Sequence, residues 1–154
     1  MSQVYLIAAD KELPLCDRRE YRESAVTVPN NEHVMIGCTR GFAVTEHIYY
    51  RDAVDGLGLE IKPFQYALDF ECCEADLNHL LAYLRENFSP GEEAELWSLW
   101  VGSGGGERPV RYRGRLPEFD LDTLGMLTEM QYEPDITRKY PGGLISQICI
   151  TVEI

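Results

Sequence analysis

Between Phe64 and Val101 the sequence follows a strand–helix–strand pattern, around which we expect the core to form. It begins with Phe64-Gln65-Tyr66-Ala67-Leu68-Asp69-Phe70-Glu71, where large apolar side chains occupy every second position, as in a strand with one face against a core. From Cys73 the apolar spacing changes to three and four residues, which is typical of one face of a helix: Cys73, Leu77, Leu80, Leu81, Leu84 and Phe88. Ser89-Pro90-Gly91 ends the helix, and a second strand follows at Leu96-Trp97-Ser98-Leu99-Trp100-Val101.

The flanking sequence adds further strands and a shorter helix. Residues 4–9 and 148–154 are strand-like, the latter with strict polar–apolar alternation. Gly37 to Gly41 resembles the loop of a hairpin joining 34–36 to 42–44, with extended chain continuing to Arg51. Residues 110–116 are expected to pair with 96–101 as an antiparallel hairpin. The sequence therefore predicts one α+β domain over residues 1–154, with a mostly antiparallel sheet of about five to seven strands, a main helix near 73–88 and a shorter helix near 120–131.

The composition narrows the classes of partner and the compartment. A formal net charge of −12 over 154 residues repels phosphate backbones and anionic bilayers, so we expect neither nucleic acid nor membrane as a partner. No apolar run approaches the roughly 18 to 20 residues that a membrane span needs. The first residues lack the pattern of an export leader, and the five cysteines form no C-x-x-C pair. We therefore expect a cytoplasmic protein with reduced thiols.

Three stretches carry a family likeness: Leu6 to Leu15, then Ile36-Gly37-Cys38 with Gly41-Phe42, and Glu95-Leu96-Trp97. In these stretches the chain resembles a group of small bacterial cytosolic proteins with no assigned function. Members of that group are richer in glycine and cysteine around the 36–42 segment than this chain is. The resemblance implies a bacterial cytosolic origin and brings no activity with it.

Cys38 is the candidate for a reactive thiol. Arg40 lies close enough in sequence to favour a thiolate, and His33 or His47 could act as a base beside it. A packed, unreactive cysteine is the alternative.

A second candidate site is the row formed by Arg111, Arg113 and Arg115. Alternate residues of a strand share a face, so the three guanidinium groups are expected to lie together, with Trp97 opposite Arg113 on the paired strand. Such a row can bind an anion or carboxylate. It can equally form a structural ladder of ion pairs and a cation–π contact.

The sequence shows no pattern of residues typical of a metal or cofactor site. The three histidines are scattered and show no ligand spacing. Acidic side chains do gather where the strand meets the main helix, at Asp69, Glu71, Glu74 and Asp76. We interpret them as solvent-facing groups that complement the helix dipole, and we expect neither a metal nor a cofactor.

Two function classes follow from these observations. The first is a non-catalytic cytosolic binding or protein-interaction domain, which contacts a protein partner or a second copy through an exposed sheet face or edge. Residues 96–101 and 148–154 motivate this expectation. The alternative is a small ligand-binding domain or thiol-dependent enzyme that uses Cys38 or the arginine-lined anion site.

Overall fold

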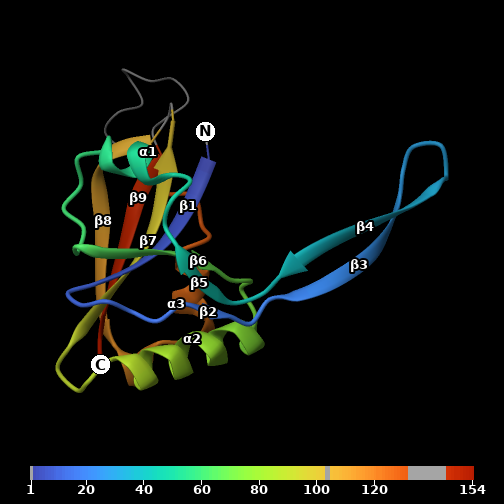
Figure 1. The fold of residues 1–154 in the computed structure, drawn as a ribbon. Coiled ribbons are helices and arrows are strands. Elements are labelled where there is room, and N and C mark those ends of the chain that lie inside the picture. The colour runs from blue at the N-terminus through green and yellow to red at the C-terminus, as the bar shows by residue number, and fades with distance from the viewer. Residues whose placement is uncertain (1, 103–104, 132–144) are drawn as a thin grey trace.

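The structure is a computed structural model that describes residues 2–102, 105–131 and 145–154, without the side chains at 105–107. Within these residues the chain forms a seven-stranded sheet with helices, and a separate two-stranded hairpin that projects from it (Figure 1). The strands are β1 (Ser2–Ala9), β2 (Cys16–Asp17), β3 (Glu20–Thr27), β4 (His33–Arg40), β5 (Ala43–Glu46), β6 (Phe64–Asp69), β7 (Glu93–Val101), β8 (Gly105–Arg115) and β9 (Ile145–Glu153). The helices are α1 (Arg51–Asp55), α2 (Glu74–Asn87), α3 (Leu121–Met126) and a 3-10 turn at Leu116–Glu118.

The main sheet has the order β2-β5-β6-β1-β7-β9-β8. Every neighbouring pair is antiparallel except β8 and β9, which are parallel. The predicted α+β class is therefore confirmed, with seven strands in a mostly antiparallel sheet and one main helix.

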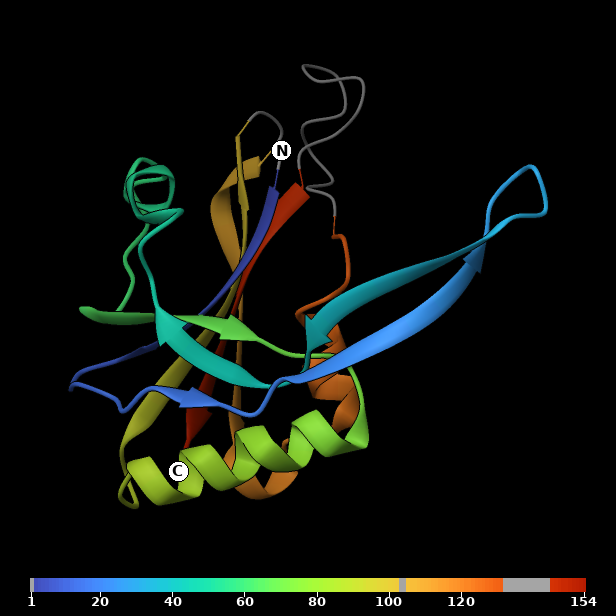
Figure 2. The same cartoon turned by 45° about the vertical axis from the view of Figure 1, so that its right-hand side comes forward.

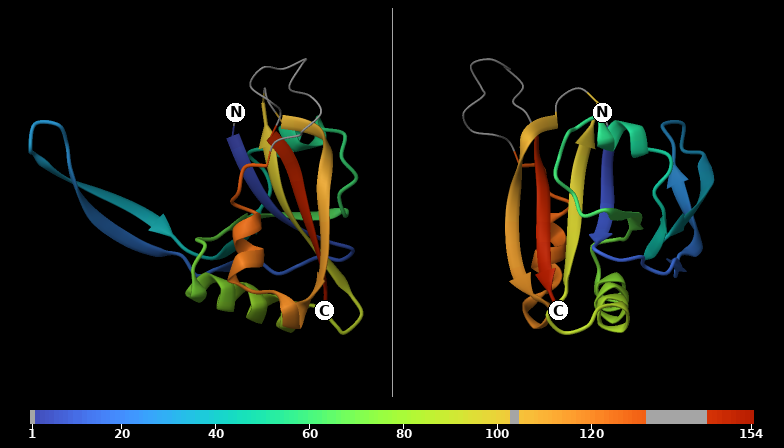
Figure 3. Two further views of the ribbon diagram at one scale, coloured as in Figure 1. Left: turned by 180° about the vertical axis from the view of Figure 1, so that it is seen from behind. Right: turned by 60° about the vertical axis from the view of Figure 1, so that its left-hand side comes forward.

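Apolar side chains fill both faces of the central strands. The first face, with Ile7, Leu96 and Ile150, packs against α2 and α3 through buried residues such as Leu80 and Leu124. Figure 2 shows α2 running beneath the sheet, and Figure 3 shows α3 beside it. The second face carries a smaller cluster of Val4, Leu6, Ala8, Trp97, Leu99, Val101 and Cys149, which packs with Val54 of α1 and the segment after it.

The main helix agrees closely with its sequence pattern. Cys73 is its N-cap, and Leu77, Leu80 and Leu84 are buried as their spacing requires. The shorter helix is real but ends at Met126, before the predicted limit near 131. Its N-cap is Asp120, whose carboxylate accepts a hydrogen bond of 2.9 Å from the Thr123 backbone N–H.

Two predicted hairpins are wrong. Gly37 lies inside strand β4 and not in a loop, because residues 33–40 pair continuously with 20–27. Strand β8 does not pair with β7, because β9 lies between them and pairs with both. The expected extension through Arg51 is also wrong, since residues 51–55 form α1.

Candidate functional site

The most unusual feature of the structure is the arm, which we define as residues 20–40, comprising β3, the loop 28–32 and β4. Figure 1 shows it extending away from the main sheet and its helices. Fifteen of its sixteen strand residues are exposed, and Cys38 is half-buried. Two strands of eight residues span roughly 26 Å, so the arm is long for a protein of this size.

The arm continues the edge of the main sheet in one register. Cys16 pairs with Val44 in the main sheet, Glu20 with Arg40 at the start of the arm, and Thr27 with His33 near its tip. The Arg18 backbone N–H donates to the Phe42 carbonyl at 2.8 Å and bridges the two ladders. The arm is thus the outer end of a single long hairpin whose inner end belongs to the main sheet.

Both faces of the arm carry exposed apolar side chains. Opposed residues of an antiparallel pair share a face, so Val26, Val34 and Ile36 lie together on one face of the hairpin, which we call the first face of the arm. They are 41%, 43% and 50% exposed. The second face carries Met35 and Tyr21, which are 60% and 66% exposed.

A free hairpin of this kind is marginal in water. An isolated two-stranded ribbon has no layer to cover its apolar side chains, and three strands or a packed helix are normally needed. Covering the exposed part of the five large apolar side chains would contribute roughly 4 to 7 kcal/mol, before the entropic cost of association. The arm therefore has a strong physical reason to be covered.

The outer edges of β3 and β4 have free backbone groups. The Val28 N–H donates to the Glu32 carbonyl, and the Arg18 N–H donates to the Phe42 carbonyl. Hydrogen-bonded and non-hydrogen-bonded pairs alternate along an antiparallel ladder, so the pairs of even-numbered residues between these two bonds are the hydrogen-bonded ones. Odd-numbered residues of the arm consequently point their N–H and C=O groups outward. On β4 these residues are His33, Met35, Gly37 and Thr39. In the described parts of the chain, no strand lies on the outer side of β4 to bond these outward groups.

Charged side chains hold the base of the arm. Arg19 contacts Asp17 at 2.7 Å and Asp69 at 3.2 Å. Arg22 and Arg40, one from each strand, lie 3.8 and 3.7 Å from the Glu71 carboxylate at the end of β6. Hydrogen bonding to Arg19 lowers the pKa of Asp17 to about 2, so this carboxylate remains charged at neutral pH. Exposed ion pairs of this type contribute little to stability, and their role here is to orient the arm.

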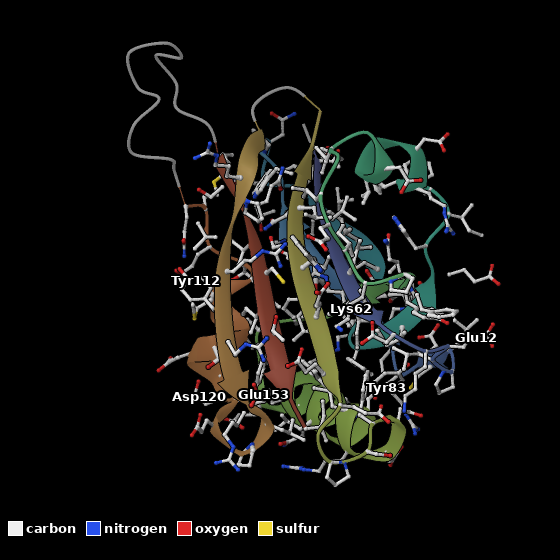
Figure 4. The ribbon with its side chains drawn as sticks, turned by 90° about the vertical axis from the view of Figure 1, so that its left-hand side faces the viewer. Glu12, Lys62, Tyr83, Tyr112, Asp120 and Glu153 are labelled. Carbon is white, nitrogen blue, oxygen red and sulfur yellow. The ribbon has the colours of Figure 1, made fainter. Side chains whose placement is uncertain are left out.

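The arginine row lies on the second sheet face, because Arg111 pairs with Cys149 of that face and Arg115 pairs with Glu153, which is labelled in Figure 4. Arg111 stacks on Trp97 at 5.1 Å and donates to the Glu60 carbonyl at 3.3 Å. Arg113 binds Glu93 at 2.5 Å and Glu153 at 2.6 Å, and hydrogen bonding to these two carboxylates raises the pKa of its guanidinium. Arg115 lines a hollow of about 260 Å³ with Glu118 and Phe119. Arg111 and Arg113 are thus engaged in structural contacts, and Trp97 is fully buried, with its Nε1–H donating to Glu95.

Cys38 lies on the first face of the arm, opposite Arg22. The imidazole of His33 belongs to the other face of the same strand and contacts the Thr27 hydroxyl oxygen at 3.3 Å. His47 lies beyond the far end of β5, in a buried position. Neither histidine is placed to act on Cys38 as a base.

Three potential metal ligands lie together at the start of α2. The ligand atoms of Glu71, Cys73 and Asp76 are within 4.8 Å of one another. Asp76 is buried, and its carboxylate accepts a hydrogen bond of 2.7 Å from the Glu71 backbone N–H. Because Glu71 also faces Arg22 and Arg40, this cluster has a structural explanation as the joint between arm and helix.

Sequence reasoning did not identify the apolar residues of the arm as a site. Residues 96–101 and 148–154 motivated an exposed sheet surface. Residues 96–101, 148–150 and 152 are instead buried in the main sheet, and residues 151, 153 and 154 are half-buried. The signal for the arm was the turn sequence Pro29-Asn30-Asn31, flanked symmetrically by Val26 and Val34. Asn31 has a φ of 59°, as expected of such a turn.

Comparisons with models of known protein families, with curated proteins and with solved structures found no match to this chain. In the described part of the chain, no helix is long and apolar enough to span a bilayer.

Proposed function

We propose that this protein is a non-catalytic protein-interaction domain that binds its partner through the arm. The observation that supports it most is that fifteen of the sixteen strand residues of the arm are exposed and that they include five large apolar side chains. Contiguous exposed apolar surface of this kind is typical of protein-binding sites. All five cysteines are free, which favours a reducing, cytoplasmic setting.

The charge distribution along the arm supports a protein partner. From Ser24 to Ile36 the only charged residue is Glu32, although 26% of the chain is charged. Depletion of charge is the compositional feature of protein interface cores. A nucleic acid would require a basic surface, which the arm does not offer.

The hydrophilic tip of the arm indicates that a partner contacts the sides of its strands and not its end. The loop 28–32 contains Asn30, Asn31 and Glu32, so the outermost part of the arm is its most hydrophilic part. A hairpin that inserts into a bilayer would have apolar residues there. The apolar residues instead lie along the strands, where a flanking protein strand or layer can cover them.

Site-specific photocrosslinking in the producing cells tests this proposal. Val34 on the arm is replaced by p-benzoylphenylalanine, and a matched variant carries the same group at Glu86, an exposed position of α2. We expect a discrete covalent adduct from the Val34 position, identified by mass spectrometry, and no such adduct from Glu86. An absence of adducts, or the same adducts from both positions, would contradict the proposal.

A further inference from the structure

We propose that the partner of the arm is a second copy of this chain, and that the two copies join by antiparallel pairing of their β4 edges about a two-fold axis. The result is a continuous sheet in the order β3-β4-β4-β3. This inference rests on the proposed function and names the partner. Identical strands pair naturally in this way, because a two-fold interface uses the same surface on both copies.

The two edges of the arm differ in how well they suit pairing. Strand β3 carries Glu20, Arg22 and Glu23 in its first half, and charged residues on an edge discourage strand addition. Residues 33–39 of β4 contain no lysine, arginine, aspartate or glutamate, and they include Val34, Met35 and Ile36. The free N–H and C=O groups of Met35 and Gly37 are therefore presented on an uncharged edge.

One register uses the whole of β4 and matches its charges. With the axis at Ile36, Met35 pairs with Gly37 of the second copy, and His33 pairs with its Thr39. These are the four residues of β4 whose backbone groups point outward, so the outward groups of both β4 strands are hydrogen-bonded. The same register places Val34 opposite Cys38. It also places Glu32 opposite Arg40, so the single acid of the distal arm meets a guanidinium that is 61% exposed.

Pairing in this register also brings apolar side chains of the two copies together. Val26, Val34 and Ile36 share the first face of the arm, and the axis places Ile36 opposite Ile36 of the second copy and Val34 opposite its Cys38 on that same face. The contact lies on a part of the molecule with almost no charge. Two chains with a net charge of −12 can therefore associate through their arms while the acidic remainder of each chain stays apart.

Proline substitution at matched positions tests which edge pairs. Met35 and Ala25 face each other across the hairpin, and both N–H groups point outward, so proline at either position spares the bonds between β3 and β4. The measurement is the mass of the full-length protein by light scattering, and a single chain has a mass of 17.6 kDa. We expect the dimer mass for the wild type, Ala25→Pro and Met35→Ala. We expect the single-chain mass for Met35→Pro. A monomeric wild type, or equal loss of the dimer in Ala25→Pro, would overturn the proposal.

Disulfide trapping tests the register. In Val34→Cys the new thiol lies opposite Cys38 of the second copy in a non-hydrogen-bonded pair, where the Cα atoms are about 4.5 Å apart and a disulfide can close. We expect a covalent dimer on mild oxidation, its loss in Val34→Cys/Cys38→Ser, and none in Val26→Cys, because Val26 lies on the outer strand β3, away from the second copy. Equal crosslinking of Val26→Cys would overturn the register.

The photocrosslinking result separates the two proposals. An adduct between Val34 and this chain itself supports both. An adduct with a different protein alone overturns the dimer but leaves the arm as an interaction site, and no adduct overturns both.

Discussion

Tyr83 illustrates how single buried residues fix the position of the chain that leads into the arm. It lies in α2, is 4% exposed, and its hydroxyl donates to the Pro14 carbonyl at 2.7 Å. Pro14 precedes β2, the strand from which the arm continues. This hydrogen bond therefore ties the base of the long hairpin to the main helix.

Removing the Tyr83 hydroxyl should destabilise the protein measurably. Tyr83→Phe leaves the Pro14 carbonyl without its donor, so we expect a loss of about 1 kcal/mol in the free energy of unfolding. Urea denaturation monitored by circular dichroism measures it. Tyr49→Phe is the control, because Tyr49 is 89% exposed, and an equal loss in that variant would contradict the explanation.

His47 gives the protein a predictable pH dependence. Its side chain is 4% exposed, and its Nε2 atom has no hydrogen-bond partner among the described residues. Burial, followed by the positive charge of Arg51, lowers the pKa of His47 below its usual value of 6.5. The unfolded chain therefore binds more protons than the folded chain below about pH 6.5, and stability falls as the pH is lowered through this range.

We expect the His47→Phe variant to lose less stability than the wild type between pH 7 and pH 5. Urea denaturation at the two pH values measures the difference. His79→Gln serves as the control for removal of an imidazole, since His79 is exposed on α2. An identical pH dependence in the wild type and His47→Phe would show that His47 is not responsible.

Among the elements, the arm depends on a glycine at its base. Gly41 joins β4 to β5 with a φ of 131°, a conformation that side chains rarely adopt. A Cβ atom at this position would lie 3.3 Å from the Cα of Arg19, in the segment that joins β2 to β3. Gly41 therefore allows the long hairpin to leave the main sheet without changing its register.

The Gly41→Ala substitution should cost about 1 to 3 kcal/mol of stability, because alanine is strained in this conformation. The matched control is Gly114→Ala in β8, where an added Cβ meets nothing within 4 Å and the backbone is ordinary. Guanidinium denaturation compares the two variants. Similar stabilities would mean that the base of the arm tolerates a side chain and that our account of its geometry is wrong.

Local sequence patterns predicted some elements well and others poorly. The apolar spacing from Cys73 to Phe88 located α2 within one residue at each end, because a helix is determined by neighbours three and four positions apart. The arm was misread because Gly37 resembles a turn residue, whereas here it accommodates the ring of Tyr21 from the opposite strand. Strand pairing across such a hairpin is not visible in either strand alone.

The position of β9 between β7 and β8 could not be predicted from the local sequence pattern either, because it depends on strand pairing. Its alternation over 148–154 predicted one polar face, and on that face Thr151 and Glu153 are half-buried while Cys149 is buried. Ser146 and Gln147, at the start of the same strand, are buried as well, and the Gln147 side-chain amide accepts from the Trp100 N–H and donates to the Trp100 carbonyl. A strand inserted between β7 and β8 is covered on both sides, and only the sheet order reveals this. The sequence predicted that Trp97 faces Arg113 on a directly paired strand. With β9 between the two strands, Trp97 instead contacts Arg111.

On the scale of the whole molecule, a well-packed sheet and its helices carry an arm that is not packed at all. The central strands are almost entirely buried, whereas the strands of the arm are almost entirely exposed. A protein that needed only a stable fold could close the β2–β5 ladder with a short turn. We infer that the arm is present because it contacts a partner, and our central claim is that its β4 edge is covered in the working protein.

Amide hydrogen exchange at Met35 and Gly37, measured residue by residue by NMR on the purified full-length protein, tests this claim most directly. Their N–H groups point outward from the hairpin, whereas those of Val34 and Ile36 are bonded to β3 and provide an internal reference. If the β4 edges pair, Met35 and Gly37 will exchange as slowly as Ile36, and dilution will accelerate them. Exchange at Met35 and Gly37 as fast as at Asn30 in the loop, while Ile36 stays protected, would contradict the account.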